Sequence, residues 1–106
     1  MNTFILCINY RGPRPDLGTK LDEREDKASK LLKAAGGELV NFYRIQGRFD
    51  VLAIVEMPDA ETMHAFNLAM QDEHFTVETM RGFTPEEYPA VWEKAGRIWK
   101  ESGVEA

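Results

Sequence analysis

The sequence predicts an α+β fold of the ferredoxin-like βαββαβ type, with a four-stranded antiparallel sheet and an extra C-terminal helix. Segments 4–10 and 51–57 are almost continuously apolar, as expected of inner strands covered on both faces. Segments 38–45 and 75–83 alternate in polarity, and helical periodicity separates the strands. Right-handed crossovers place the first and third strands at the centre of such a sheet, where the apolar segments are needed. We expect one domain over residues 1–106, with its core in 3–88 and the last helix in 85–102.

The first half of the chain supplies a strand and a helix. A glycine- and proline-containing loop, 11–18, follows the strand at 4–10. Helical spacing over 19–35 predicts an inward face made by Leu21, Ala28, Leu31, Leu32 and Ala35. The charged residues of the same segment, Glu25 among them, are expected to form its solvated face. Gly36 and Gly37 end the helix, one of them in the left-handed cap position.

The second half opens with a hairpin. In the strand at 38–45, alternation places Leu39, Asn41, Tyr43 and Ile45 on one side and Val40, Phe42 and Arg44 on the other. The connection 46–50 contains a glycine and returns the chain into 51–57. Asp59 is the expected N-cap of a helix whose inward residues are Met63, Phe66, Asn67 and Met70, and the strand at 75–83 follows.

The last helix has a strong start signal. Thr84 is the expected N-cap, Pro85 the first helical residue, and Glu87 completes a capping box. The helix then carries one apolar stripe, made by Val91, Trp92, Ala95, Ile98 and Trp99.

Composition excludes several functional classes. The net charge of −5 disfavours nucleic acid and acidic membrane surfaces, because both bind through excess Lys and Arg. Neither a signal peptide nor a membrane-spanning segment is present, so we expect a cytoplasmic location. Cys7 is the only cysteine and is expected to be buried. His64 and His74 lack the spacing of a metal pair, and we expect neither metal nor cofactor.

The inner strands carry apolar residues on both faces, whereas two helices cover only one. One face carries Ile5, Cys7, Leu52 and Ile54, and the other carries Phe4, Leu6, Ile8, Val51, Ala53 and Val55, so the face that the helices leave open needs a cover. A homodimer in which a twin sheet covers this face is the favoured answer. The alternative is that the last helix folds back over it, and the same helix is also suited to clasping the partner.

The segment 47–50 (Gly-Arg-Phe-Asp), followed by 51–56 and Pro58-Asp59, resembles the signature of GYD domain proteins, within the dimeric α+β barrel superfamily. Segments 36–39, 42–43, 76–81 and 83–84 agree as well, so that the resemblance spans about 3–88. It implies the fold and a homodimer. Phe49 stands where the family has its name-giving tyrosine, so no role of that hydroxyl is carried over.

Seven polar residues are candidates for a site. We assign possible catalytic roles to Tyr43, Asp50 and His64, and the possible ligand-binding residues are Asn41, Arg48, Glu78 and Arg81. A structural role of Arg48 and Asp50 in the hairpin is the competing interpretation. Glu78 and Arg81 have opposite parity and should face opposite sides of the sheet.

The leading functional hypothesis is a dimeric protein that binds a small apolar or aromatic molecule. Whether it also catalyses a cofactor-independent isomerisation, cyclisation or oxygenation is left open. The alternative is a non-catalytic regulatory or assembly module, acting through its sheet face or its C-terminal helix.

Overall fold

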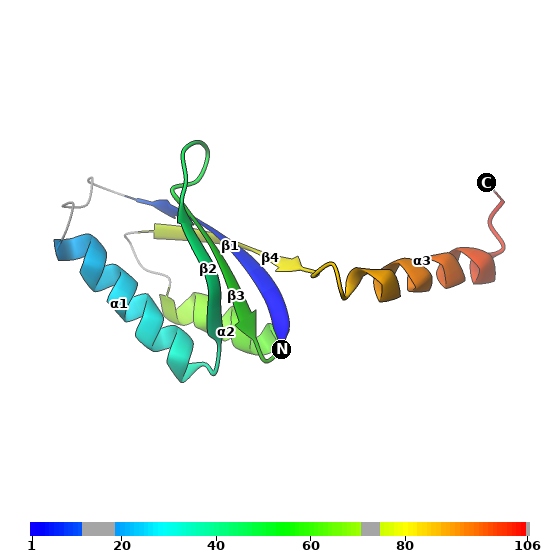
Figure 1. Cartoon of the computed structure of the whole chain (residues 1–106), viewed down its shortest axis with the longest axis horizontal. Helices are drawn as coiled ribbons and strands as arrows, with labels where there is room; N and C mark the ends of the chain where they lie inside the picture. Colours follow the sequence, from blue (N-terminus) through cyan, green and yellow to red (C-terminus); the bar gives the residue numbers. More distant parts are fainter. Residues whose placement is uncertain (12–18, 71–74, 106) are drawn as a thin grey trace.

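The computed structural model describes residues 1–11, 19–70 and 75–105, and it has the predicted fold (Figure 1). The elements are β1 Asn2–Tyr10, α1 Thr19–Ala34, β2 Glu38–Arg44, β3 Val51–Met57, α2 Ala60–Met70, β4 Phe75–Gly82 and α3 Tyr88–Ser102. The strands form one sheet in the order β2-β3-β1-β4, and all three pairings are antiparallel. The two continuously apolar strands are therefore the central ones, as the topology required.

The sheet has an inner face and an open face. α1 and α2 lie on the same side of the sheet, as Figure 1 shows, and the inner face packs against them. Strand register assigns the two faces, because directly opposed residues share a side. The open face carries Thr3, Ile5, Cys7, Asn9, Glu38, Asn41, Tyr43, Leu52, Ile54, Glu56, Thr76, Glu78 and Met80.

The core lies between the inner face and the two helices. Its members are Phe4, Leu6, Leu32, Ala53, Val55, Met57, Met63, Phe66 and Met70. Met57 and Leu6 are the most deeply enclosed, with 0% and 2% of their surface exposed. Cys7 is buried as well, at 6% exposure, although it belongs to the open face. Leu21, expected in this core, has a side chain outside the described residues.

The predicted alternation of β2 is wrong at its start. The register shifts between Leu39 and Asn41, so that Leu39 lies opposite Val55 and Asn41 lies opposite Ile54. Val40 is the extra residue of a β-bulge, and a bulge moves every residue before it to the other side of the strand. Leu39 therefore shares the inner face with Phe42, and does not lie on the side of Asn41 and Tyr43.

α1 ends and α2 begins at the glycine and aspartate signals that the sequence predicted. Gly36 has a φ of +75°, the left-handed conformation of a helix cap, and its neighbour Gly37 donates a hydrogen bond to the carbonyl oxygen of Leu32 at 3.0 Å. At the start of α2, the Asp59 carboxylate accepts a hydrogen bond from the Thr62 N–H at 2.7 Å.

The last helix begins at Tyr88, three residues later than predicted. The capping-box hydrogen bonds form, since the Thr84 N–H donates to the Glu87 carboxylate at 3.1 Å and the Glu87 N–H donates to the Thr84 hydroxyl at 3.3 Å. They close a turn that precedes the helix. Pro89 has no N–H to donate to the carbonyl of Pro85, so the regular helical ladder cannot start at Pro85. α3 ends at Gly103, which has a φ of +71°.

α3 projects away from the rest of the domain (Figure 1) and does not fold back over its own sheet. None of its residues is buried. The radius of gyration is 17.4 Å, whereas a compact domain of this length has about 13 Å. No helix in the described ranges is long and apolar enough to cross a membrane.

Candidate functional site

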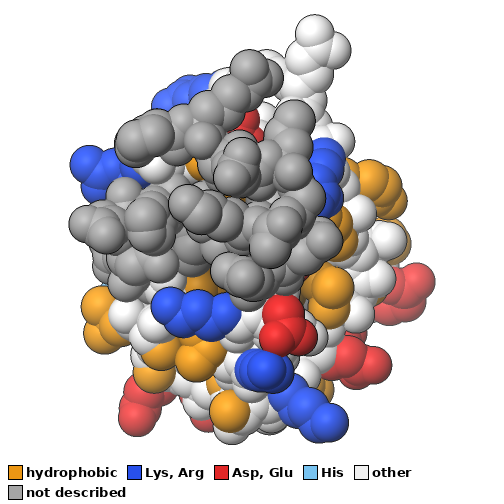
Figure 2. Space-filling view, turned by 90° about the vertical axis from the view of Figure 1, so that its left-hand side faces the viewer, with side chains coloured by type: hydrophobic (Ala, Val, Ile, Leu, Met, Phe, Trp, Pro, Cys, Tyr) orange, Lys and Arg blue, Asp and Glu red, His pale blue; other side chains and the backbone are white. Residues whose placement is uncertain are grey.

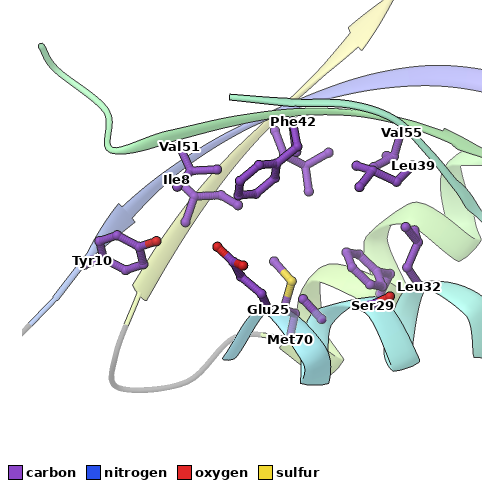
Figure 3. Close-up of a pocket in the computed structure, with 14 residues that line it drawn as sticks. Ile8, Tyr10, Glu25, Ser29, Leu32, Leu39, Phe42, Val51, Val55 and Met70 are labelled. Atoms are coloured by element: carbon purple, nitrogen blue, oxygen red, sulfur yellow. The ribbon is translucent and has the colours of Figure 1, made fainter. Parts of the chain in front are cut away.

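A cavity of about 320 Å³ lies between the inner face of the sheet and the two packed helices (Figure 3). It is almost entirely apolar. Its walls are Leu6, Ile8, Tyr10, Glu25, Ala28, Ser29, Leu32, Leu39, Phe42, Val51, Ala53, Val55, Phe66 and Met70. A volume of this size is at the lower end of what small-molecule pockets offer, about 300–1,000 Å³.

The few polar groups of the cavity wall include side chains of α1. Glu25, Ala28, Ser29 and Leu32 have the spacing i, i+3, i+4, i+7, which places all four on the same side of the helix. Glu25 and Ser29 project toward the sheet in Figure 3. Glu25, which was predicted to belong to the solvated side of α1, therefore borders the cavity while its side chain stays partly exposed.

An ion pair includes one of the residues that line the cavity. The Arg44 guanidinium on β2 binds the Glu25 carboxylate on α1, and it also lies 5.5 Å from the centre of the Phe42 ring. Glu25 and Phe42 both line the cavity, whereas Arg44 does not. The carboxylate is thus the charged group that a bound molecule would meet.

Asp50 lies in the hairpin between β2 and β3 and binds the backbone of β1. Its carboxylate accepts a hydrogen bond from the Tyr10 N–H at 2.9 Å, and its own N–H donates to the Ile8 carbonyl oxygen at 2.9 Å. Its carbonyl oxygen accepts from the Ile45 N–H at 2.9 Å. These bonds fasten the hairpin to the end of β1, which supports the structural interpretation of Asp50.

Arg81 lies where β4 passes into α3. Its guanidinium donates to the carbonyl oxygens of Thr3 (3.1 Å) and Gly82 and to the Glu87 carboxylate (3.3 Å), and it stacks 4.4 Å from the centre of the Phe83 ring. Asn2 accepts a further hydrogen bond at 3.3 Å. Arg81 therefore holds the junction of sheet and helix together.

Three further candidates, Asn41, Tyr43 and Glu78, belong to the open face. Asn41 and Tyr43 lie opposite Ile54 and Leu52, and Glu78 lies opposite Cys7. Arg81 lies opposite Phe4, on the inner face, so the predicted opposition of Glu78 and Arg81 is confirmed.

The other two candidates are exposed, and neither of them lines the cavity. His64 is on the outward side of α2, and Arg48 lies in the hairpin beside the Phe49 ring, 5.5 Å from its centre. None of the seven candidates lines the cavity, and the structure does not gather them into one cluster. Their proposed roles stay predictions. His74 lies outside the described residues.

Among the residues that Figure 2 draws in colour, side chains of both charges are present. Lysine, arginine and acidic side chains lie interspersed there, with hydrophobic side chains between them. Within the described residues, no group of three or more His, Cys, Asp or Glu side chains is placed to hold a metal ion.

Solved structures share the fold at low sequence identity. The hypothetical protein PHS023 from Pyrococcus horikoshii is 17% identical, with a TM-score of 0.50, over 79% of this chain and 92% of that one. FFRP-DM1 is 21% identical, with a TM-score of 0.51, over 78% of this chain and all of that one. An AsnC family transcriptional regulator from Agrobacterium tumefaciens is 22% identical, with a TM-score of 0.50, over 78% of this chain but only 51% of the regulator.

No curated protein matches the chain. The family model of the GYD domain matches residues 15–91, which is well over half of the sequence. The matched segment contains both helices that border the cavity and ends within α3, so that Trp92, Ile98 and Trp99 lie beyond it. The chain therefore belongs to the GYD domain family.

Proposed function

We propose that this protein binds a small apolar or aromatic molecule in the cavity between the sheet and helices α1 and α2, and that it does so as a homodimer. The observation that carries the proposal is the cavity itself. Apolar side chains from β1, β2, β3, α1 and α2 surround it. A protein core is normally filled by its own side chains, so an unfilled apolar cavity of this size supports the binding of a ligand.

The polar groups of the wall define the ligand further. Glu25 carries a carboxylate and Ser29 a hydroxyl, whereas Arg44 is outside the cavity. A carboxylate accepts hydrogen bonds and attracts cations. The preferred ligand is therefore an apolar body that ends in an amine or a hydroxyl.

The open face supports the proposed homodimer. Ile5, Cys7, Leu52, Ile54 and Met80 lie together on it, and neither packed helix covers them. Burying about 800 Å² per partner is typical of a stable interface. A second sheet placed face to face supplies that area, and the similarity of fold to AsnC-type and FFRP structures is compatible with it.

Of the two forms of the proposed function, the geometry favours ligand binding without catalysis. Asp50 and Arg81 are engaged in hydrogen bonds that hold the fold together, and Tyr43 and His64 lie on different surfaces. A turnover assay with single substitutions of Tyr43, Asp50 and His64 tests the remaining enzymatic interpretation. Loss of turnover with intact ligand binding would reinstate it.

The test of the cavity uses three probes of one shape: 2-naphthylmethylamine, 2-naphthalenemethanol and 2-naphthoic acid. We expect the amine and the alcohol to raise the melting temperature and to bind in isothermal titration, with the acid weaker than both. Ser29→Phe fills the cavity and should abolish binding. Ala34→Phe places the same ring on the exposed side of α1 and should leave binding unchanged. Equal binding to both variants would refute the proposal.

A regulatory or assembly module is the second candidate, and one observation favours it. Trp92 and Trp99 are 73% and 52% exposed on a helix that no part of the domain covers. Removing residues 89–106 while retaining the cavity separates the two functions. Loss of association with full binding of the naphthyl probes assigns assembly to α3 and ligand binding to the core.

A further inference from the structure

The cavity between the sheet and the two packed helices has an apolar end and a charged end. Leu39 lies opposite Val55 on the inner face, and Arg44 lies opposite Val51, with Phe42 between them on β2. Leu39, Phe42 and both valines line the cavity. Figure 3 shows Leu39 beside Val55 at one end and Val51 at the other. The cavity therefore runs along the strands, and Arg44 lies at the end that Val51 marks.

α1 repeats this polarity on the facing wall. Leu32 lies toward the Leu39 end in Figure 3, whereas Glu25 lies toward the Val51 end. The two residues of α1 are seven positions apart, which is about 10 Å along a helix. On both walls, a leucine thus borders one end of the cavity and a charged side chain lies at the other.

The charged end holds one group of each sign. The Arg44 guanidinium binds the Glu25 carboxylate there, and it lies 5.5 Å from the centre of the Phe42 ring. The side chains of Arg44 and Glu25 are 49% and 38% exposed. An ion pair with this exposure changes a folding equilibrium by less than about fivefold. A ligand that separates the two groups therefore gives up little stability of the fold.

A ligand with both charges replaces both halves of this pair. An ammonium group donates hydrogen bonds to the Glu25 carboxylate, and a carboxylate accepts them from the Arg44 guanidinium. A hydrogen bond to a charged group changes an affinity by about ten- to hundredfold, which exceeds the loss of the exposed pair. A molecule with one charge satisfies only one of the two protein groups. The charged end therefore fits a zwitterion better than an amine or an acid.

The rest of the cavity sets the size of the apolar part. At about 30 Å³ for each water-sized group, a cavity of about 320 Å³ holds roughly ten such groups. The distance from Val51 to Val55 along β3 is about 13 Å. The apolar part is therefore elongated and has the size of a naphthyl group.

We infer that the ligand of this cavity is a zwitterion with an elongated apolar group, whose ammonium binds Glu25 and whose carboxylate binds Arg44. An α-amino acid with a large aromatic side chain has this chemistry. The apolar group points toward Leu32 and Leu39. The inference rests on the proposed ligand-binding function, and it adds the head group of the ligand and its orientation.

The test uses three probes that share one apolar group and differ in the head group. 3-(2-Naphthyl)-L-alanine carries the ammonium and the carboxylate, 2-(2-naphthyl)ethylamine lacks the carboxylate, and 3-(2-naphthyl)propanoic acid lacks the ammonium. In isothermal titration of the full chain, we expect the amino acid to bind at least tenfold more tightly than the amine. The acid should bind most weakly, because it takes Arg44 from Glu25 and offers the Glu25 carboxylate no cation.

Arg44→Gln tests the contact with the ligand carboxylate. The affinity for the amino acid should fall at least tenfold, whereas the affinity for the amine should not fall. Arg48→Gln is the matched control, because Arg48 is an exposed arginine of the neighbouring hairpin that does not line the cavity. This control should keep the full preference for the amino acid. A preference that persists in Arg44→Gln would overturn the role of Arg44.

The outcomes separate this inference from the proposed function. If the wild type binds the amine or the acid as tightly as the amino acid, the zwitterion is refuted and the cavity remains a ligand site. If the wild type binds no naphthyl probe, both are refuted. The comparison of the three probes on the wild type needs no variant, so it decides the inference even where Arg44→Gln fails to fold.

Discussion

The Asp50 carboxylate holds the backbone N–H of Tyr10 at 2.9 Å, across forty positions of sequence. Tyr10 is the last residue of β1 and lines the cavity, so this bond holds the backbone of one lining residue although Asp50 does not line the cavity itself. The sequence suggested Asp50 as a possible catalytic residue. In this structure its carboxylate binds the backbone beside the cavity.

We expect Asp50→Ala to lower the free energy of unfolding by about 1 kcal/mol, the usual contribution of one hydrogen bond. Urea denaturation measures it. Arg48→Ala, in the same hairpin, removes an exposed side chain and should stay within about 0.5 kcal/mol. Equal effects of the two substitutions would contradict the role assigned to the Tyr10 bond.

The substitution Glu25→Gln should change the preference for the ligand amine much more than the stability of the fold. The side chains of Glu25 and Arg44 are partly exposed, so the ion pair contributes less than about 1 kcal/mol to folding. Binding of 2-naphthylmethylamine should fall roughly tenfold, the equivalent of one charge-assisted hydrogen bond. Binding of 2-naphthalenemethanol should change less. Titration calorimetry measures both, and an unchanged amine affinity would place the ligand amine elsewhere.

Replacing either of two adjacent glycines should lower the stability of the fold, for a different reason at each position. Gly36 has a φ of +75°, so Gly36→Ala costs about 1 kcal/mol of backbone strain. At Gly37 a Cβ atom would lie 2.6 Å from the Met57 sulfur and 3.0 Å from the Glu56 carbonyl oxygen, and Gly37→Ala should cost about 1–3 kcal/mol through overpacking. Thermal denaturation tests both. In a double-mutant cycle with Met57→Ala, which is itself destabilising because Met57 is buried, only the Gly37 variant should show a favourable coupling, because the added methyl group meets the Met57 sulfur.

The Glu87 carboxylate gives α3 an acid-sensitive attachment. The hydrogen bond from the Thr84 N–H, with help from Arg81, holds the pKa of Glu87 below its ordinary value of 4.5. Its contribution to stability is therefore present at neutral pH and is lost as the pH falls through the lowered pKa.

Urea denaturation over a pH series should show this loss in the wild type. In Glu87→Gln the group does not titrate, so the difference in unfolding free energy between the two proteins should shrink below pH 4.5. Parallel pH profiles of the two proteins would show that the carboxylate does not stabilise the turn.

The element order, the inner strands and the starts of α1 and α2 were predictable because each depends on local spacing. Each signal determines the structure of residues that are close to it in the sequence. The signals are the apolar runs, Asp59 before α2 and the glycines after α1. The faces of the sheet were also correct for β1, β3 and β4. The start of β2 was not, since the bulge at Val40 depends on pairing with β3 and leaves no local signature.

The cavity was harder to foresee than the fold. Its polar groups, Glu25 and Ser29, belong to a segment crowded with charges, where a solvated face is the simplest interpretation. The spacing of Glu25, Ala28, Ser29 and Leu32 was the available signal. The position of Arg44 beside Glu25 depends on the packing angle of α1, which cannot be read from one sequence.

The bulge at Val40 has a consequence for protein engineering. Leu39 lies opposite Val55 and Asn41 opposite Ile54, so Val40 is a surplus residue that neither face requires. A chain shortened by this one residue should keep the same wall around the cavity while its edge strand becomes regular. An edge without irregularity is a better template for further strands, so the extra valine serves as a safeguard against uncontrolled growth of the sheet.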